Sequence, residues 1–247
     1  MENVTGIDSI VERQIRRWEK EKRRRQQSAI ASTAWPCITI SREFGASGLA
    51  IGRAVSADLG FGFWDQEIVN AISEQTGLDA KILNSLDEHT RNAVDDFLDA
   101  LLRKESYSVG DYLKELMQIV ATVSAHGAAV FIGRGTQFLL PGDKALHVRV
   151  VASRPERLNH IQDSMNVDAD EAERMLERVE NERRTFIRRH YGQDVTLSSH
   201  YDLIVNSATL GAQGAAELIK SAYKSRFGSL PKLDVSTAPA SVAPVLD

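Results

Sequence analysis

Residues 45 to 49 join an apolar run to a stretch with helical spacing, and they read Gly45-Ala46-Ser47-Gly48-Leu49. A strand, a turn of small residues and a helix form a cradle for an anion, because glycine lets backbone N–H groups converge and the helix N-terminus adds a positive dipole. The sequence therefore predicts a turn that binds phosphate. The common loop G-x-x-x-x-G-K-[ST] also carries a lysine and a hydroxyl, whereas this chain continues with Leu49-Ala50 after Gly48.

Arg42 is the first candidate to supply the missing positive charge. It stands in Ser41-Arg42-Glu43-Phe44, directly after the apolar run Cys37-Ile38-Thr39-Ile40, and is tethered close to the turn. A guanidinium group there can neutralise a cradled phosphate. We predict Arg42 as a catalytic residue, and an ion pair with Glu43 or another carboxylate at the surface is the competing interpretation.

Two further arginines follow expected strands. Arg134 lies in Gly133-Arg134-Gly135 after the apolar run Val130-Phe131-Ile132, and Arg157 falls in the first turn of a helix that follows Ala152-Ser153. Because the carboxyl ends of parallel strands meet at one edge of a sheet, both guanidinium groups are expected at that edge, where arginine can bind phosphate with two parallel hydrogen bonds. A solvated turn arginine and a helix-surface arginine are the competing interpretations.

A cluster of arginines lies further along the chain, at Arg183, Arg184, Arg188 and Arg189. Arg184 and Arg188 are four residues apart and therefore share one helix face. Clustered cations repel one another unless solvent screens them or an anion binds. The segment is therefore either a solvated face or a lid that closes over a phosphoryl group.

Asp65 follows Phe63-Trp64, where a second strand is expected to end. It either accepts hydrogen bonds from the base or ribose of a ligand or caps the helix beginning at Gln66. The six histidines show no metal-ligand spacing, and no serine, histidine and acid combine into a nucleophilic site. We therefore predict no metal site built from protein side chains.

The composition supports one globular core. The 247 residues are 43% hydrophobic and 26% charged, and the formal net charge of -4 gives no general attraction to nucleic acid. The single cysteine, Cys37, is expected in the core and fits a reducing compartment. No run reaches the roughly 18 apolar residues that span a bilayer, and the first residues do not read as a signal peptide, so we expect a cytoplasmic protein.

The two ends of the chain differ in composition from its middle. Residues 1–36 hold an amphipathic seam, the basic run Lys20 to Arg25 and a linker, Ala31 to Pro36; the seam consists of Ile7, Val11, Ile15 and Trp18. Such a seam packs on the body of the protein or on a second copy in a homodimer. Residues 230–247 are rich in Pro, Ala, Val and Ser and are expected to form a disordered tail, which leaves residues 37–229 as the folded domain.

Apolar runs alternate with helical patterns in that domain. The runs Ile38–Ile40, Ala129–Ile132 and Leu203–Val205 are apolar on both faces, as in parallel strands that are covered on both sides. A further run, Leu146–Val151, contains His147 and Arg149, which indicate a wetter face or a position nearer an edge. Strands separated by helices predict a doubly wound parallel α/β sheet, which binds ligands at the carboxyl ends of its strands.

The helices between these runs have clear apolar stripes. One contains Val94, Phe97, Leu98, Leu101 and Leu102, and another contains Leu113, Leu116, Met117 and Val120. Asp168, with Glu171 three residues later, is typical of the N-terminus of a long charged helix.

In their order and spacing, these segments resemble the cytidylate kinase-like family, in the nucleoside monophosphate kinase group of P-loop phosphotransferases. The segments concerned are Ile38 to Gly52, Phe63 to Ile68, Phe131 to Gly135, Ala152 to Arg157 and Arg184 to Asn206. The resemblance implies a P-loop sheet with a helical insert and a lid. It also implies transfer of the γ-phosphoryl group of ATP, with Mg²⁺, to CMP or dCMP.

The resemblance implies roles by position. Gly45, Ala46, Ser47, Gly48 and Leu49 would hold the ATP phosphates; Asp65 and Arg134 would contact the acceptor nucleotide; Arg157, Arg184 and Arg188 would surround the transferred group. Two features depart from authentic cytidylate kinases, because the lysine and hydroxyl of the loop are missing and Asn206 stands where an aspartate is expected.

Two other functions stay open. A nucleotide-binding regulatory protein with weak or no turnover is the runner-up, because the turn has no lysine. A third interpretation places the function in the basic run Lys20 to Arg25, which would touch nucleic acid or an acidic membrane, although an acidic chain with few clustered aromatics argues against it. The expected partners are small-molecule nucleotides, with no membrane and no nucleic acid.

Overall fold

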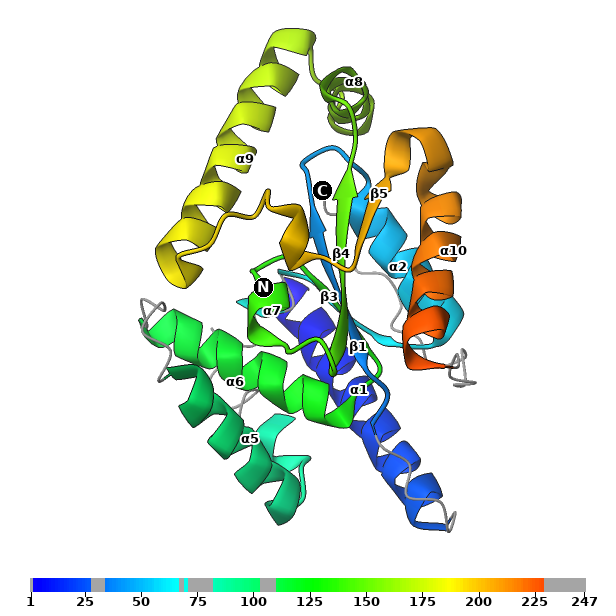
Figure 1. Cartoon of the computed structure of the whole chain (residues 1–247), viewed down its shortest axis with the longest axis vertical. Helices are drawn as coiled ribbons and strands as arrows, with labels where there is room; N and C mark the ends of the chain where they lie inside the picture. Colours follow the sequence, from blue (N-terminus) through cyan, green and yellow to red (C-terminus); the bar gives the residue numbers. More distant parts are fainter. Residues whose placement is uncertain (1, 28–33, 67–68, 71–81, 103–109, 229–247) are drawn as a thin grey trace.

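The structure is a computed structural model that describes residues 2–27, 34–66, 69–70, 82–102 and 110–228. Its strands form one parallel sheet in the order β2-β3-β1-β4-β5 (Figure 1). They are β1 (Cys37–Arg42), β2 (Gly62–Trp64), β3 (Ala129–Ile132), β4 (Ala145–Val151) and β5 (Leu203–Asn206). The predicted parallel α/β architecture is confirmed.

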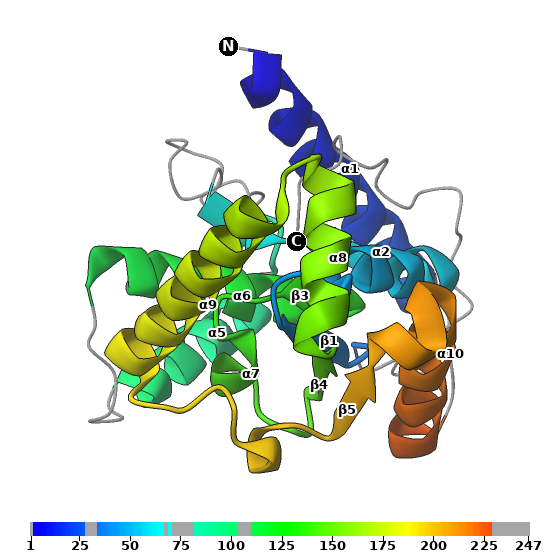
Figure 2. The same ribbon diagram turned by 90° about the horizontal axis from the view of Figure 1, so that it is seen from above.

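Helices cover both faces of the sheet. They are α1 (Glu2–Gln27), α2 (Gly48–Leu59), α5 (Glu88–Leu102), α6 (Asp111–His126), α7 (Thr136–Leu139), α8 (Arg154–Met165), α9 (Ala169–Tyr191), a 3-10 turn η1 (Ser198–His200) and α10 (Ser207–Phe227). α2 and α10 lie together on one face, and α6 and α7 lie on the other (Figure 1). α8 and α9 lie over the edge formed by the carboxyl ends of the strands, as the view from above shows (Figure 2).

β1 occupies the centre of the sheet because its apolar residues are covered on both sides. Ile38 and Ile40 are fully buried, and Cys37 is buried as expected. Desolvation raises the pKa of the Cys37 thiol to about 12, so this sulfur stays protonated. The strand positions the Ser41–Glu43 segment at the carboxyl edge.

One expectation about the strands was wrong. Leu203–Val205 was expected to be covered on both sides, but β5 is an edge strand and Ile204 is 44% exposed. The polar residues of β4 were expected to mark a wetter face or a position nearer an edge; β4 does lie beside the edge strand β5, but Arg149 is only 7% exposed. Arg149 tolerates burial because other polar groups lie beside it, as described below.

The apolar seam of α1 packs on the body of the protein. Val11 and Trp18 belong to the same hydrophobic core as the sheet, and Ile15 packs against it. Trp18 stacks on His126 of α6, with 3.9 Å between the ring centroids, and on Trp64 of β2, with 6.0 Å. Packing on the body was one of the two predicted uses of the seam; a homodimer through α1 stays a prediction, and the side chain of Ile7 lies outside the described residues.

Side-chain caps fix the start of two helices. Asp168 accepts a hydrogen bond from the backbone N–H of Glu171, which confirms the predicted N-terminus of α9. Asn206 accepts one from the N–H of Ala208 and so begins α10. None of the described helices combines the length and apolar content that crossing a membrane requires. The expected tail, residues 230–247, lies outside the described residues.

His147 should make the stability of the protein sensitive to acid. Burial lowers the pKa of this imidazole, Asp202 partly opposes that effect, and its Nδ1 lies 2.9 Å from the hydroxyl of Thr39. A histidine whose folded pKa is depressed stabilises the protein above its ordinary pKa, and this contribution is lost as the pH falls through the folded pKa. We expect His147→Gln to flatten the decrease in Tm between about pH 7 and about pH 5. His160→Gln, at an exposed position of α8, is the control and should follow the parent protein.

Candidate functional site

A cavity of about 410 Å³ opens at the carboxyl ends of β1 and β3. Its walls come from Ser41–Glu43 at the end of β1, from Gly133–Gly135 after β3, from Arg149 of β4 and from the second half of α9. This is the edge at which a doubly wound sheet binds ligands. The topology therefore brings together segments that lie more than a hundred residues apart in the sequence.

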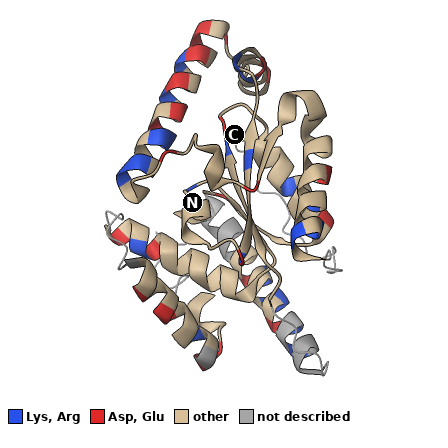
Figure 3. Ribbon diagram, viewed as in Figure 1, with Lys and Arg blue, Asp and Glu red and all other residues tan. Residues whose placement is uncertain are grey.

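The walls of the cavity are positively charged. Five arginines line it, Arg42, Arg134, Arg149, Arg183 and Arg184, against three glutamates, Glu43, Glu180 and Glu182. This leaves a formal excess of two positive charges. Figure 3 shows that arginines gather in the C-terminal part of α9, whereas acidic residues dominate its first half. An anionic ligand would complete the charge balance of this cavity.

The glycine turn lies beside the cavity and leads into the N-terminus of α2. Gly45 and Ser47 have left-handed φ values of 80° and 58°. Ser47 is the N-cap of α2 but makes no side-chain cap, and the first turn of α2 holds no acidic residue. The first N–H groups of a helix lack intrahelical partners, so an anion can accept from them here. None of residues 45–49 lines the cavity itself.

Arg42 bridges the turn and the cavity. A Cβ atom on Gly48 would come within 2.5 Å of the Arg42 Cβ, and a Cβ atom on Gly133 would collide with the Arg42 Nη1. Both glycines therefore leave room for the Arg42 side chain, which runs from β1 past the start of α2 to the turn after β3. Glu43 contacts two other arginines, Arg149 and Arg157, and the competing interpretation, an ion pair of Arg42 with Glu43 or another carboxylate, stays open.

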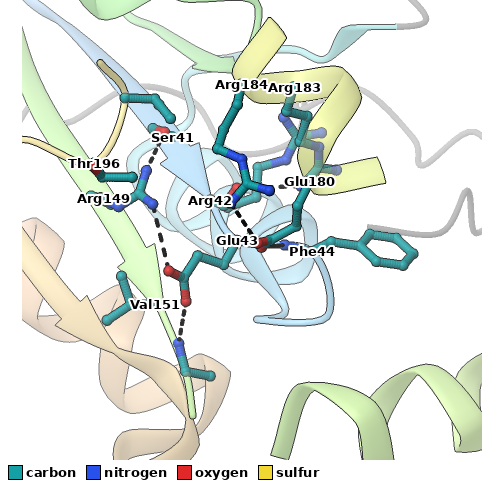
Figure 4. Close-up of polar contacts among 12 residues, drawn as sticks. Ser41, Arg42, Glu43, Phe44, Arg149, Val151, Glu180, Arg183, Arg184 and Thr196 are labelled. Carbon is teal, nitrogen blue, oxygen red and sulfur yellow. Dashed lines mark hydrogen bonds and ion pairs between the residues drawn. The ribbon is translucent and has the colours of Figure 1, made fainter. Parts of the chain in front are cut away.

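Glu43 and Glu180 link three arginines, which come from β4, α8 and α9 (Figure 4). Glu43 lies 3.5 Å from Arg149 and 3.7 Å from Arg157, and it accepts a hydrogen bond from the N–H of Ala152. Glu180 of α9 lies 2.5 Å from Arg157 and 4.0 Å from Arg184. The network ties α8 and α9 to the end of β1.

Two further contacts connect α9 to β1. Glu180 accepts a hydrogen bond from the N–H of Phe44, at 3.4 Å, and Arg183 donates one to the carbonyl of Arg42, at 3.2 Å (Figure 4). The Arg183 guanidinium also lies over the Phe44 ring, 5.5 Å from its centroid. Glu180 and Arg183 are three residues apart on one helix face, so α9 is held against the segment that precedes the glycine turn.

Arg134 is held in a strained turn. It has a left-handed φ of 54° between Gly133 and Gly135, which have φ values of 75° and 69°. Its carbonyl accepts a hydrogen bond of 2.6 Å from the Tyr191 hydroxyl. Strained backbone persists where surrounding contacts fix it, and it gathers at functional sites.

Aromatic rings surround the guanidinium of Arg134. Its Cζ lies 5.0 Å from the centroid of Phe186 and 5.7 Å from that of Tyr112, and the side-chain oxygen of Asn70 accepts from its Nη2. Burial lowers the pKa of Arg134, and the nearby Tyr112 and Tyr191 oppose this effect. The side chain is therefore fixed in place at the cavity wall before any ligand arrives.

The structure separates the other predicted site residues. Arg184 lines the cavity, whereas Arg188 is exposed and does not. Arg157 is 8% exposed, so it is no helix-surface arginine, but it lies behind the cavity wall between Glu43 and Glu180. Asp65 is buried outside the cavity, and its carbonyl accepts from the N–H of Val69 at the start of the following helix.

The sequence did not single out Ser41, Arg149 or Glu180 as site residues, although all three line the cavity. Arg149 had a signal in the interrupted apolar pattern of β4, which indicates a polar group buried within a sheet as well as a wet face. Glu180 had no comparable signal, because its partners Phe44 and Arg157 are distant in the sequence.

No group of three or more histidine, cysteine, aspartate or glutamate residues in the described part of the chain could hold a metal ion. Magnesium in phosphotransferases is bound by one or two carboxylates together with substrate phosphates, so a cage of protein side chains is not needed. Glu43 and Glu180, the carboxylates nearest the arginines, are already paired.

A parallel sheet with helices on both faces and a glycine turn after its first strand is the arrangement of P-loop proteins. The model of the cytidylate kinase-like family matches residues 37–209, and the chain belongs to this family. No curated protein matches the chain.

Solved structures match the chain at low sequence identity. An uncharacterized protein from Eubacterium ventriosum ATCC 27560 is 14% identical, with a TM-score of 0.54 over 77% of this chain and 99% of that chain. A shikimate kinase from Acinetobacter baumannii in complex with shikimate is 14% identical, with a TM-score of 0.40 over 82% and 97% of the two chains. A shikimate kinase from Bacteroides thetaiotaomicron is 13% identical, with a TM-score of 0.43 over 78% and 99%.

Proposed function

We propose that this protein transfers the γ-phosphoryl group of ATP to a nucleoside monophosphate, and that CMP or dCMP is the acceptor. The observation that carries the proposal is the cavity with five arginines beside the glycine turn, at the carboxyl ends of β1 and β3. Phosphoryl transfer requires mainly that the reacting groups are positioned and that their charge is neutralised. An arginine-rich cavity next to an anion cradle can do both.

The donor would bind at the turn. The backbone of residues 45–49 and the N-terminus of α2 would hold the phosphates of ATP, and Mg²⁺ bound to those phosphates would neutralise part of their charge. Arg42 lies between this turn and the cavity and would take the place of the missing lysine. Its guanidinium would stabilise the negative charge that develops on the transferred group in the transition state.

The acceptor would bind in the cavity. Arg134 would donate two hydrogen bonds to its phosphate, because the rings of Phe186 and Tyr112 already hold the guanidinium in one orientation. Arg184 would close over the reacting groups from α9, with Arg188 one turn further along the helix. Arg157 would position Glu43 and Glu180. Asp65, which lies outside the cavity, would influence acceptor binding only by fixing the position of the adjacent Gln66, which lines the cavity.

Arg134→Lys should raise the KM for the acceptor and leave ATP binding nearly unchanged. Lysine keeps the charge but loses the planar fork and its stacking on the two rings, so about tenfold weaker acceptor binding is expected. Steady-state kinetics with each substrate varied in turn measures the two effects. A KM for ATP that rises as much as the KM for the acceptor would place Arg134 at the donor instead.

The function is tested with the full chain, ATP, Mg²⁺ and a panel of CMP, dCMP, UMP and AMP. ADP release in a coupled assay reports turnover, and titration calorimetry reports binding. Faster turnover with CMP or dCMP than with UMP or AMP supports the proposal. A flat profile, or no product with any of the four, overturns the cytidylate assignment. Binding of ATP without turnover favours the nucleotide-binding regulatory protein, whose basis is the turn without a lysine.

A further inference from the structure

Arg149 is a buried cation that the proposed reaction does not use. It projects from β4 and is 7% exposed, yet it lines the cavity. In the sheet it lies opposite Ser41 of β1, and the Tyr201 ring lies under its guanidinium, with 5.7 Å between Cζ and the ring centroid. Burial of a charge within a sheet costs free energy unless other groups satisfy it.

The protein's own groups provide only long contacts to the guanidinium of Arg149. Its Nη1 donates to the Ser41 hydroxyl at 3.3 Å, and its Nη2 lies 3.5 Å from Glu43. Charge-assisted hydrogen bonds are shorter, at about 2.7 to 2.9 Å. Glu43 also serves Arg157 and the N–H of Ala152, so one carboxylate is shared between two buried cations.

Ser41 adds a second donor at the same place. A hydroxyl group has one hydrogen to donate and two lone pairs. Because the Ser41 oxygen accepts from Arg149, its hydrogen is left to donate toward another group, and the residue lines the cavity. A guanidinium and a hydroxyl that both donate into a positively charged cavity form a position for an anionic oxygen group.

We propose that Ser41 and Arg149 form a second anion-binding position in the cavity, separate from the position at Arg134, and that this second position takes a phosphate or a carboxylate group. Tyr201 and Glu43 are positioning residues, because they hold the plane of the guanidinium through its face and one edge. The inference does not rest on CMP or dCMP as the acceptor, because each carries a single phosphate and the proposed function assigns that phosphate to Arg134. The second position would take a further anionic group that reaches β4.

The test is titration calorimetry without ATP, with inorganic phosphate, CMP and gluconate as separate probes. The parent protein is compared with two variants. Ser41→Ala removes the hydroxyl donor and leaves the ion pairs of Glu43 with Arg149 and Arg157 in place, and Arg149→Lys keeps the positive charge but loses the planar guanidinium group. Arg174→Gln is the control, since this arginine on α9 is exposed and pairs with Glu171. Thermal unfolding of each variant is measured in parallel.

We expect Ser41→Ala and Arg149→Lys to lower the binding affinity for the anion by about three- to tenfold, which is the effect of one hydrogen bond. The Tm of Ser41→Ala should be nearly unchanged. Arg174→Gln should bind like the parent. A loss of affinity for phosphate and CMP alone assigns the position to a phosphate group. A loss of affinity for gluconate alone assigns it to a carboxylate group.

The proposal is overturned if Ser41→Ala and Arg149→Lys bind all three probes like the parent, or if the parent binds none of them at millimolar concentration. Turnover plays no part in these titrations. A protein that binds the anion through Ser41 but never releases ADP would therefore refute the kinase proposal alone, whereas turnover with unchanged anion binding in Ser41→Ala would refute this inference alone.

Discussion

Arg42→Ala is expected to lower kcat/KM by about one to two orders of magnitude, because under the proposed function it would remove a charge-assisted phosphate contact of about 1.5 to 3 kcal/mol. Arg42 reaches from the glycine turn to the turn after β3, through the space that Gly48 and Gly133 leave open. Steady-state kinetics measures the loss, and thermal unfolding shows whether the fold persists.

Two further variants are compared with Arg42→Ala. Arg42→Lys retains the aliphatic stem beside Gly48 and one charge, so it should recover part of the activity. Arg174→Ala removes a positive charge from the exposed surface of α9 and should leave kcat/KM unchanged. An Arg42→Ala protein with the kinetics of the parent would show that another cation serves the donor phosphates.

Glu180→Ala should lower the free energy of unfolding by about 2 to 4 kcal/mol, because it leaves the buried Arg157 with one carboxylate instead of two. The variant also removes the acceptor for the N–H of Phe44. Chemical denaturation measures the change. Arg157 retains its contact with Glu43, which keeps the expected loss below that of a fully unpaired buried charge.

Glu177→Ala is the matched control for Glu180. It lies one turn earlier on α9, its side chain is 69% exposed, and its ion pair with Arg154 is 3.4 Å long. Exposed pairs contribute about 0 to 1 kcal/mol, so little change is expected. Equal losses in the two variants would mean that Glu180 does not hold α9 to the segment around Phe44.

The fold could be predicted because the local order of apolar and polar residues indicates which strands are buried. The runs that became β1 and β3 are apolar on both faces, and the spacing of Leu113, Leu116 and Met117 is that of a helix stripe. The edge position of β5 could not be predicted in this way. Ile204 is apolar but exposed, and which strand forms the edge depends on the order of the strands in the sheet.

The candidate site was predictable where a residue's place in the chain determines its place in the sheet. Arg42 is the last residue of β1 and Arg134 lies two residues after β3, so the sheet alone brings them to one edge. The burial of Arg157 depends on Glu43 and Glu180, which are distant in sequence, and no spacing rule connects the three. Arg149 was visible only as an interruption of an apolar run, a pattern that does not distinguish a wet face from a buried polar group.

The turn after β3 places opposite demands on its three residues. Gly133 and Gly135 disfavour a side chain, since a Cβ atom would displace the end of the Arg42 side chain at one position and meet the Tyr191 ring at the other, and both φ values are positive. Arg134 also has a positive φ, which costs a side-chain-bearing residue about 1 to 2 kcal/mol. A screen for stability alone would therefore accept glycine or asparagine at position 134, whereas a screen for activity would reject both.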